Sequence, residues 1–253
     1  MLKKIMLFST ISLTCLASSG EWSKNNFKYD EFNLPYQLFK PNNIEKEIPL
    51  VIYLHGSGEA GIDNEKQMYA GTNIGPQYFA SEEIQNIQNA YVLAPQTTPE
   101  IRWASVSIDE YDFKTTPITP SMNSLLHLID NLEKELKIDP KRIYIAGLSR
   151  GGQGVWNAAM NRPSKFAAIV PIAGSGSPKD IDLIKHIPTW VFHGNADDIT
   201  PIEVSQNMVD ALKKKNGNVK FTIVENGNHD SSWLEAHKNS ELWKWMISNK
   251  KDN

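Results

Sequence analysis

A serine in a glycine-rich turn is the strongest chemical signal in the sequence. Residues 147–151 read Gly-Leu-Ser-Arg-Gly and have Ser149 at their centre. An apolar run at 142–146 predicts a strand before this turn, and residues 152–160 predict a helix after it. A sharp strand-to-helix turn projects a serine hydroxyl above a sheet, and the N-terminus of the helix favours a developing negative charge. The spacing therefore predicts that Ser149 is a nucleophile.

A serine hydroxyl needs a base to take its proton, and the base needs an acid to orient it. After a turn of this kind the acid and then the base follow later in the chain. Asp197 and Asp198 come soon after the apolar run 189–192, and His229 follows the run 219–224. Because ligands bind at the carboxyl ends of parallel strands, we expect these side chains to meet Ser149 at one edge of a sheet. Their positions leave both aspartates open as the acid.

The chain has six histidines, and His229 is the best placed to act as the base because it lies in a loop just after a predicted strand. His193 leads into the aspartate loop, and we expect it to hold that loop rather than to catalyse. His127 lies in a predicted helix and His186 precedes an Ile-Pro pair, so we expect both to be structural or solvated. We expect His237 to be exposed on the last helix.

A second glycine-containing turn follows the predicted strand at 49–54. Residues 54–58 read Leu-His-Gly-Ser-Gly, and such a turn can aim a backbone N–H at a tetrahedral intermediate. We expect the backbone N–H groups of Ser57 and Arg150 to form an oxyanion hole, with the side chain of Ser57 dispensable. We expect His55 to brace the loop through hydrogen bonds rather than to act as an acid or base.

The elements that must position these residues alternate along the chain. Short apolar runs predict buried strands at 49–54, 90–94, 142–146, 167–172 and 189–192, and the more alternating run 219–224 predicts a strand nearer the edge. Amphipathic patterns predict helices at 121–137, 203–215 and 241–248. This alternation predicts an α/β fold with a mostly parallel, twisted sheet and helices on both faces. Residues 27–40 predict an antiparallel hairpin at the N-terminal edge of the sheet, and residues 97–120 predict a surface excursion near the rim of the site.

The composition is that of a globular protein. The chain has 253 residues, 40% of them hydrophobic and 22% charged, and no linker or repeat divides it. We therefore expect a single domain over residues 20–253. The formal net charge is −3, so there is no basic excess of the kind that binds nucleic acid, and we predict no nucleic-acid partner.

The first nineteen residues read as a secretory signal. Lys3 and Lys4 precede a mostly apolar stretch at 5–16, and small residues follow at 17–19. We expect a secreted or periplasmic protein with no stable membrane insertion after removal of the signal. Lipid attachment through Cys15 is a less favoured alternative, because residues 12–14 match the acylation pattern poorly. Cys15 is the one cysteine in the sequence, so no disulfide can form within the chain.

Six short motifs carry a resemblance to a known family. They lie at residues 54–59, 94–96, 138–144, 147–152, 191–194 and 229–230. Together they resemble the α/β-hydrolase superfamily and its secreted esterase branch, which is labelled predicted peptidase, dienelactone-hydrolase-like or phospholipase/carboxylesterase-like. The resemblance runs from about Tyr36 to Trp245 and implies a single-domain α/β-hydrolase fold. It implies Asp197 as the acid, three residues after the glycine of the His-Gly pair, with Asp198 as the alternate.

The resemblance implies a serine carboxylic-ester hydrolase that works through an acyl-enzyme, without a cofactor or metal. Related exported enzymes suggest a small ester or an ester-decorated plant polysaccharide as substrate, with feruloyl or acetyl groups removed. We interpret Trp103 and Trp233 as possible substrate-binding residues, because flat aromatic faces stack on sugars and aromatic acids. Trp156 and Trp190 are expected in the core. Relatives often have Met or Gln in place of Arg150, whose charge either favours an anionic substrate or lies in solvent.

Other functions stay open from the sequence. A serine peptidase of the prolyl-oligopeptidase-like type or a cofactor-free perhydrolase would use the same three residues. A non-catalytic glycan-binding module on this fold would not need Ser149, Asp197 and His229 together. A metal-dependent hydrolase would use His193, Asp197, Asp198 and His229 as ligands, but their spacing forms no compact ligand motif.

Overall fold

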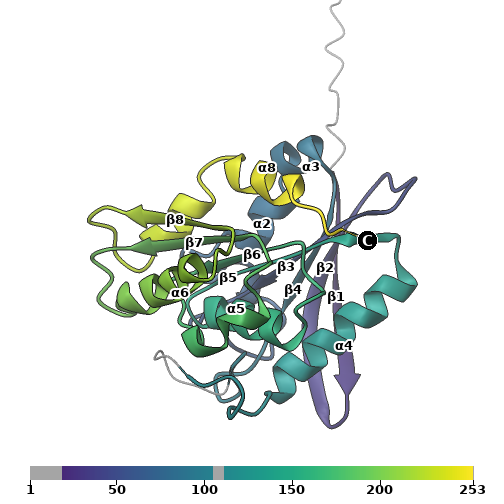
Figure 1. The fold of residues 1–253 in the computed structure, drawn as a ribbon. Coiled ribbons are helices and arrows are strands. Elements are labelled where there is room, and N and C mark those ends of the chain that lie inside the picture. Colours follow the sequence, from purple (N-terminus) through teal and green to yellow (C-terminus); the bar gives the residue numbers. More distant parts are fainter. Residues whose placement is uncertain (1–18, 105–110, 253) are drawn as a thin grey trace, which may run out of the picture.

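An eight-stranded sheet forms the centre of the computed structural model, which describes residues 19–104 and 111–252 (Figure 1). The strands lie in the order β1-β2-β4-β3-β5-β6-β7-β8. Their bounds are β1 Gly20–Tyr29, β2 Phe32–Pro41, β3 Ile48–Leu54, β4 Tyr91–Pro95, β5 Ile138–Leu148, β6 Ala168–Ile172, β7 Thr189–Gly194 and β8 Val219–Val224. Neighbours from β4 to β8 pair in parallel, whereas β1 pairs with β2 and β2 with β4 in antiparallel register. The predicted mostly parallel sheet with an antiparallel edge pair is confirmed.

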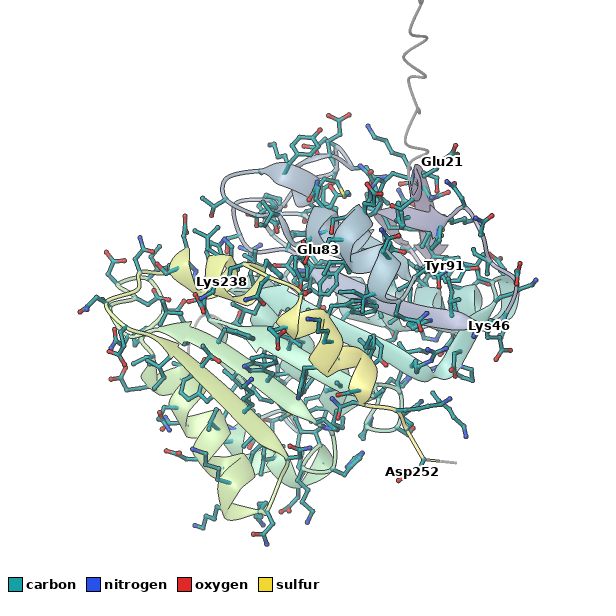
Figure 2. The ribbon with its side chains drawn as sticks, turned by 90° about the horizontal axis from the view of Figure 1, so that it is seen from above. Glu21, Lys46, Glu83, Tyr91, Lys238 and Asp252 are labelled. Carbon is teal, nitrogen blue, oxygen red and sulfur yellow. The ribbon has the colours of Figure 1, made fainter. Side chains whose placement is uncertain are left out.

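Helices cover both faces of the sheet. The α-helices are α1 Lys66–Tyr69, α2 Gly75–Ala80, α3 Glu82–Ile87, α4 Pro120–Glu135, α5 Arg150–Asn161, α6 Glu203–Lys214, α7 Ser231–Ala236 and α8 Glu241–Ser248. Helices α4, α5 and α6 pack into one apolar cluster, and α2, α3, α7 and α8 into another. Figure 2 shows α8 and α3 beside each other on the second face, where the indole of Trp243 donates to the carbonyl of Gln88 at 3.2 Å.

The central strands are apolar throughout because both of their faces are buried. In β3, Leu50 and Ile52 belong to the first cluster, whereas Val51 and Tyr53 belong to the second. A strand with both faces covered needs no polar alternation. The apolar runs of the sequence therefore predicted the central strands, and β8 lies at the edge as expected.

The N-terminal hairpin is longer than the predicted segment 27–40. Strand β1 begins at Gly20, and its residues alternate between exposed and partly buried. The polar sequence before Phe27 gave no apolar signal, but an edge strand needs only half of its side chains to be covered. The turn places Asp30 in the left-handed region with φ of 50°, a conformation that Asp tolerates.

Helix α4 shows how local signals set its bounds. Pro120 occupies the first turn, and the Thr119 side chain accepts a hydrogen bond from the Met122 N–H at 3.1 Å. Its predicted apolar stripe is buried at Leu125, Ile129 and Leu132. The short helices α1, α2, α3 and α7 were not predicted, because one or two turns give too little periodicity to detect.

Some predictions fall on residues that the structure does not describe. The proposed signal lies outside the described residues apart from Ser19, and the excursion at 97–120 is described except for 105–110. Within the described part of the chain, no helix has the length and apolar character needed to cross a membrane.

Candidate active site

Ser149 stands at the junction of β5 and α5 in a strained backbone conformation. Its φ is 53° and its ψ is −118°, and a positive φ is uncommon for a residue with a side chain. The two flanking glycines make this turn possible. A Cβ on Gly151 would lie 2.0 Å from the carbonyl oxygen of Leu54, and one on Gly147 would lie 2.7 Å from the carbonyl oxygen of Gly151. The turn therefore brings the serine onto the carboxyl edge of the sheet, as predicted.

A chain of hydrogen bonds joins three of the predicted residues. The Nε2 atom of His229 lies 2.9 Å from the hydroxyl oxygen of Ser149, and its Nδ1 atom lies 2.6 Å from Oδ2 of Asp197. These residues follow the carboxyl ends of β5, β7 and β8, which lie in the same half of the sheet, with β6 between β5 and β7. Asp198 is exposed to solvent. The structure thus brings Asp197 to His229, as the resemblance implied.

The Asp197 carboxylate is held in its charged form. Its side chain is fully buried, and burial by itself raises the pKa, but hydrogen bonds from His193, His229 and the Thr200 and Ile199 N–H groups hold the pKa well below its usual range. Both backbone N–H groups donate to Oδ1 at 2.9 Å. An ionised Asp197 can orient His229 and stabilise its protonated form.

His193 holds the other side of this carboxylate. Its Nε2 lies 2.8 Å from the Thr200 carbonyl oxygen and 3.2 Å from Oδ2 of Asp197, and its Nδ1 lies 2.7 Å from the hydroxyl of Ser205. A carbonyl oxygen can only accept, so Nε2 carries the proton and Nδ1 accepts from the serine. His193 therefore supports the acid loop, as expected, and its ring nitrogens are engaged in these contacts rather than free for a metal.

The two residues predicted to supply the oxyanion hole come from different elements, Ser57 from the loop after β3 and Arg150 from the start of α5. Ser57 and Arg150 line one small cavity of about 20 Å³ together with Ser149. His55 braces this loop, because its Nδ1 lies 2.6 Å from the Gly56 carbonyl oxygen and its Nε2 accepts the Thr97 N–H at 3.0 Å. Burial lowers the pKa of His55 to about 4, so the ring is neutral at pH 7 and acts as a fixed support.

The two tryptophans interpreted as substrate-binding residues require a correction. Trp103 is fully buried in the core, and its indole donates to the His55 carbonyl oxygen at 3.1 Å. Trp233 is 5% exposed; its ring meets the ring of His229 edge-on at 5.1 Å, and its indole donates to the Thr72 hydroxyl at 3.0 Å. Neither offers a free face to a sugar. Trp103 supports the oxyanion loop instead, and Trp233 supports His229.

The expectation for His237 was also wrong. It follows the short helix α7 rather than lying on α8, and its ring packs among Tyr53, Tyr78 and Phe79 with 5% exposure. Neither of its ring nitrogens has a hydrogen-bond partner among the described residues. Burial lowers the pKa of His237 to about 3, so it is a neutral ring in an aromatic cluster.

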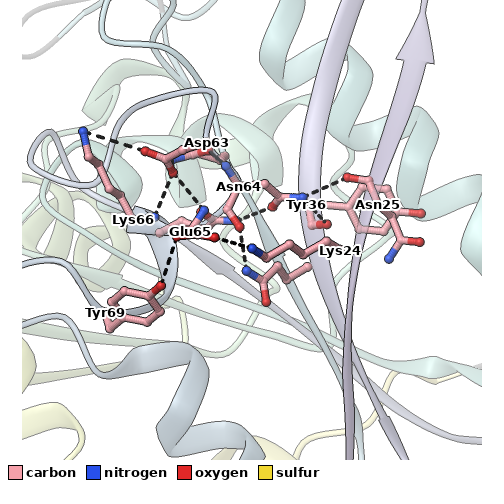
Figure 3. Close-up of polar contacts among 11 residues, drawn as sticks. Lys24, Asn25, Tyr36, Asp63, Asn64, Glu65, Lys66 and Tyr69 are labelled. Carbon is pink, nitrogen blue, oxygen red and sulfur yellow. Dashed lines mark hydrogen bonds and ion pairs between the residues drawn. The ribbon is translucent and has the colours of Figure 1, made fainter.

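A polar cluster that the sequence did not reveal anchors the continuation of the oxyanion loop to the hairpin. Figure 3 shows Asn64 at its centre, with Asn25 and Tyr36 of the hairpin beside it. The Asn64 side chain donates to the carbonyl oxygens of Asn25 and Tyr36, each at 3.1 Å, and accepts from Gln67 at 2.6 Å. Its backbone N–H donates to Gln96 at 2.6 Å. Its φ is 55°, and Asn enters the left-handed region more readily than most residues. The presence of an Asn at this position is therefore the one local sign of the turn in the sequence.

A mostly parallel sheet that carries a Ser–His–Asp hydrogen-bond chain at its carboxyl edge defines an α/β-hydrolase. Within the described residues, no group of three or more His, Cys, Asp or Glu side chains is arranged to hold a metal ion. The chain belongs to the phospholipase/carboxylesterase family, whose model matches residues 41–240.

Individual esterases and a depolymerase are also similar to this chain. A crystal structure of a thermostable esterase matches 91% of this chain and 63% of its own, with a TM-score of 0.84 and 34% identity. A bifunctional acetylxylan esterase/xylanase from Neocallimastix patriciarum is 25% identical over 162 residues, which are 64% of this chain and 21% of that protein. A poly(3-hydroxyalkanoate) depolymerase C from Paucimonas lemoignei is 27% identical over 188 residues, which are 69% of this chain and 40% of that protein. The chain thus spans less than half the length of these two curated relatives.

Proposed function

We propose that the protein is a serine carboxylesterase that works through an acyl-enzyme. The observation that carries the proposal is the hydrogen-bond chain from Ser149 through His229 to Asp197, with distances of 2.9 and 2.6 Å. Ser149 attacks the ester carbonyl while His229 takes its proton, and His229 then returns the proton to the departing alcohol. Water, activated by the same histidine, releases the acid.

The developing oxyanion needs donors that are fixed before the reaction. The backbone N–H groups of Ser57 and Arg150 supply them in this proposal, and both residues line the pocket that holds Ser149. Losing one such donor typically costs about 100- to 1000-fold in kcat. Asp197, held ionised by four hydrogen-bond donors, stabilises the positive charge that His229 carries during each transfer.

A short acyl group on a plant polysaccharide is the substrate we favour, with acetyl ahead of feruloyl. The cavity beside Ser149 has a volume of about 20 Å³, far below the roughly 300–1000 Å³ of sites for drug-sized ligands. Gln153, Ser175 and Thr200 also line it, whereas the two tryptophans that would stack on an aromatic acid are buried. The name of the Neocallimastix relative, an acetylxylan esterase/xylanase, agrees with an acetyl group on a sugar.

Two arginines favour an anionic group close to the ester. Arg102 and Arg150 both line the pocket. Burial together with the neighbouring Arg102 lowers the pKa of Arg150 from its usual value, and Glu100 offsets only part of this effect. A carboxylate on the polysaccharide near the scissile ester would offset this repulsion. We therefore propose an acidic, acetylated polysaccharide as a better substrate than a neutral one. The predicted signal at residues 1–19 would export the enzyme to such a substrate.

The test is hydrolysis of an ester panel by the purified protein, beside Ser149→Ala. The panel holds p-nitrophenyl acetate, p-nitrophenyl butyrate, methyl ferulate and acetylated xylan with and without acidic side groups. We expect release from the acetyl esters, lost by at least about 1000-fold in Ser149→Ala. A preference for methyl ferulate would reverse the acyl assignment. Cleavage of peptides with no ester hydrolysis would favour a peptidase, and no turnover by a folded protein would favour a binding role.

A further inference from the structure

A buried carboxyl lies beside the nucleophile and has no part in the mechanism above. Glu59 is 6% exposed, five residues after the end of β3. A Cβ on Gly56 would stand 3.0 Å from Oε2 of Glu59 and 3.4 Å from Cβ of Ser149. The carboxyl and the nucleophile therefore both lie close against Gly56, the residue that precedes the expected oxyanion donor Ser57.

This carboxyl is not explained by an ion pair. Its Oε2 atom is buried and has no hydrogen-bond partner among the described residues. Burial raises the pKa of Glu59, and the backbone N–H groups of Glu59 and Gly56 oppose this rise. A buried carboxyl with incomplete partners is unfavourable. If the side chain of Glu59 only filled space, an apolar side chain at this position would make the folded protein more stable.

The backbone of Glu59 is itself fixed. Its carbonyl oxygen accepts a hydrogen bond from the Gln96 side chain at 3.1 Å, and the N–H of Gly61 donates to the Thr97 carbonyl oxygen at 2.9 Å. Gln96 is fully buried and also accepts the Asn64 N–H. The carboxyl therefore extends from an anchored backbone toward Gly56, which has no side chain of its own to hold its position.

We propose that Glu59 is a positioning residue whose carboxyl holds the backbone of Gly56 and Ser57 against Ser149 and thereby fixes the N–H donor of the oxyanion hole. The inference rests on the proposed serine esterase function. Oxyanion donors act when they stand about 2.7–3.1 Å from the developing charge. A small displacement of the loop would reduce the stabilisation of the transition state more than it reduces substrate binding. The effect should therefore fall mainly on kcat.

Two variants separate a hydrogen-bond acceptor from a space-filling side chain. Glu59→Gln keeps an acceptor oxygen, whereas Glu59→Met keeps a similar length without one. With p-nitrophenyl acetate we expect Glu59→Met to lose about 10- to 100-fold in kcat, less than the loss of a whole donor, with KM changed by less than about threefold. Glu59→Gln should retain most of kcat. Wild-type kcat in Glu59→Met, or a Glu59→Gln as impaired as Glu59→Met, would overturn the proposal.

The matched control is Asp139→Asn. Asp139 is also a buried carboxyl, 8% exposed, but it lies at the opposite end of β5 and pairs with Arg142 at 2.7 Å. We expect Asp139→Asn to lower the midpoint of thermal unfolding and leave kcat unchanged. If Glu59→Met lowers kcat no more than Asp139→Asn does at an equal loss of stability, Glu59 is merely structural and the proposal fails.

A second readout does not depend on the ester chosen. The rate at which a fluorophosphonate modifies Ser149 also depends on donors to a developing oxyanion, so it should fall in Glu59→Met in parallel with kcat. If the wild-type protein reacts with the fluorophosphonate in a Glu59-dependent way but hydrolyses no ester, the esterase function fails and the role of Glu59 stands. If the wild-type Ser149 does not react, both proposals fail.

Discussion

The two halves of the catalytic edge are built by different means. The turn at Ser149 is fixed by backbone geometry, because glycines allow β5, β3 and α5 to approach so closely that a Cβ on Gly151 would lie 2.0 Å from a carbonyl oxygen. The oxyanion loop after β3 is fixed by side chains instead. His55, Gln96 and Asn64 each hold it through hydrogen bonds from buried positions.

This difference predicts how each half responds to change. A side chain added where two backbones pack closely displaces the whole turn. A catalytic hydrogen-bond chain also fails when one of its hydrogen bonds is lost or changes direction. A loop held by several side chains loses one support at a time. Substitutions in the Ser149–His229–Asp197 chain should therefore abolish nearly all activity. Substitutions of the residues that support the loop should instead give graded losses of activity and stability.

The largest effect is expected at the acid. Asp197→Asn would present an amide to Nδ1 of His229, which now lies 2.6 Å from a carboxylate oxygen, and would favour the wrong tautomer. We expect kcat to fall by about 1000- to 10000-fold. Asp198→Asn is the matched control, and since Asp198 is exposed it should change kcat little. Steady-state hydrolysis of p-nitrophenyl acetate decides the ranking, and the reverse order would overturn the assignment of Asp197.

A graded effect is expected at Asn64. Asn64→Ala removes three side-chain hydrogen bonds and leaves an alanine at φ of 55°. At about 1 kcal/mol for each bond, with a further cost of about 1–2 kcal/mol for the left-handed backbone, we expect about 4–5 kcal/mol less stability. Since the loop reaches the oxyanion hole through Gln96 and Glu59, kcat should fall by about tenfold or less. Urea unfolding and kcat measured together test this, and a variant that loses activity without stability would contradict it.

The sequence carried more information about the first half of the site than about the second. Apolar runs predicted the central strands because both faces of each strand are buried. The Gly-Leu-Ser-Arg-Gly segment predicted the strained turn because the residues that form the turn are adjacent in the sequence. The supports of the oxyanion loop come from distant segments, since Asn64 bonds to residues 28 and 39 positions away. No local pattern encodes such pairings, so the cluster around Asn64 was not foreseen.

The errors on aromatic residues have a related cause. Trp103 and Trp233 were interpreted as substrate-binding residues because flat aromatic faces stack on sugars and aromatic acids. Both are buried because the loops fold back onto the sheet, and each indole finds a polar partner in the loop system, at His55 and Thr72. Burial of a tryptophan with one satisfied N–H is common in cores, but which loop covers it depends on tertiary contacts.

The smallest effect is expected at the buried histidine that lacks polar partners. His55 has a partner on each ring nitrogen, whereas His237 lies among aromatic rings without one in the described structure. The pKa of His237 is lowered by burial to about 3, against about 6.5 in an unfolded chain. Its contribution to stability is therefore complete above pH 6.5 and is lost as the pH falls from 6.5 toward 3, because only the unfolded state takes up the proton there.

Replacing His237 should remove this dependence while preserving the aromatic cluster. Between pH 8 and pH 5 we expect His237→Phe to lose about 2 kcal/mol less of its unfolding free energy than the wild type. Urea unfolding at the two pH values measures the difference, and the exposed His186→Gln is the control for a histidine outside the core. An equal loss of unfolding free energy in both proteins would mean that the protonated ring of His237 has a hydrogen-bond acceptor in the folded state. Because the ring packs against Tyr53, Tyr78 and Phe79, none of which takes part in the proposed chemistry, kcat at pH 8 should change little. This result would separate the packing of the aromatic cluster from the chemistry at the sheet edge.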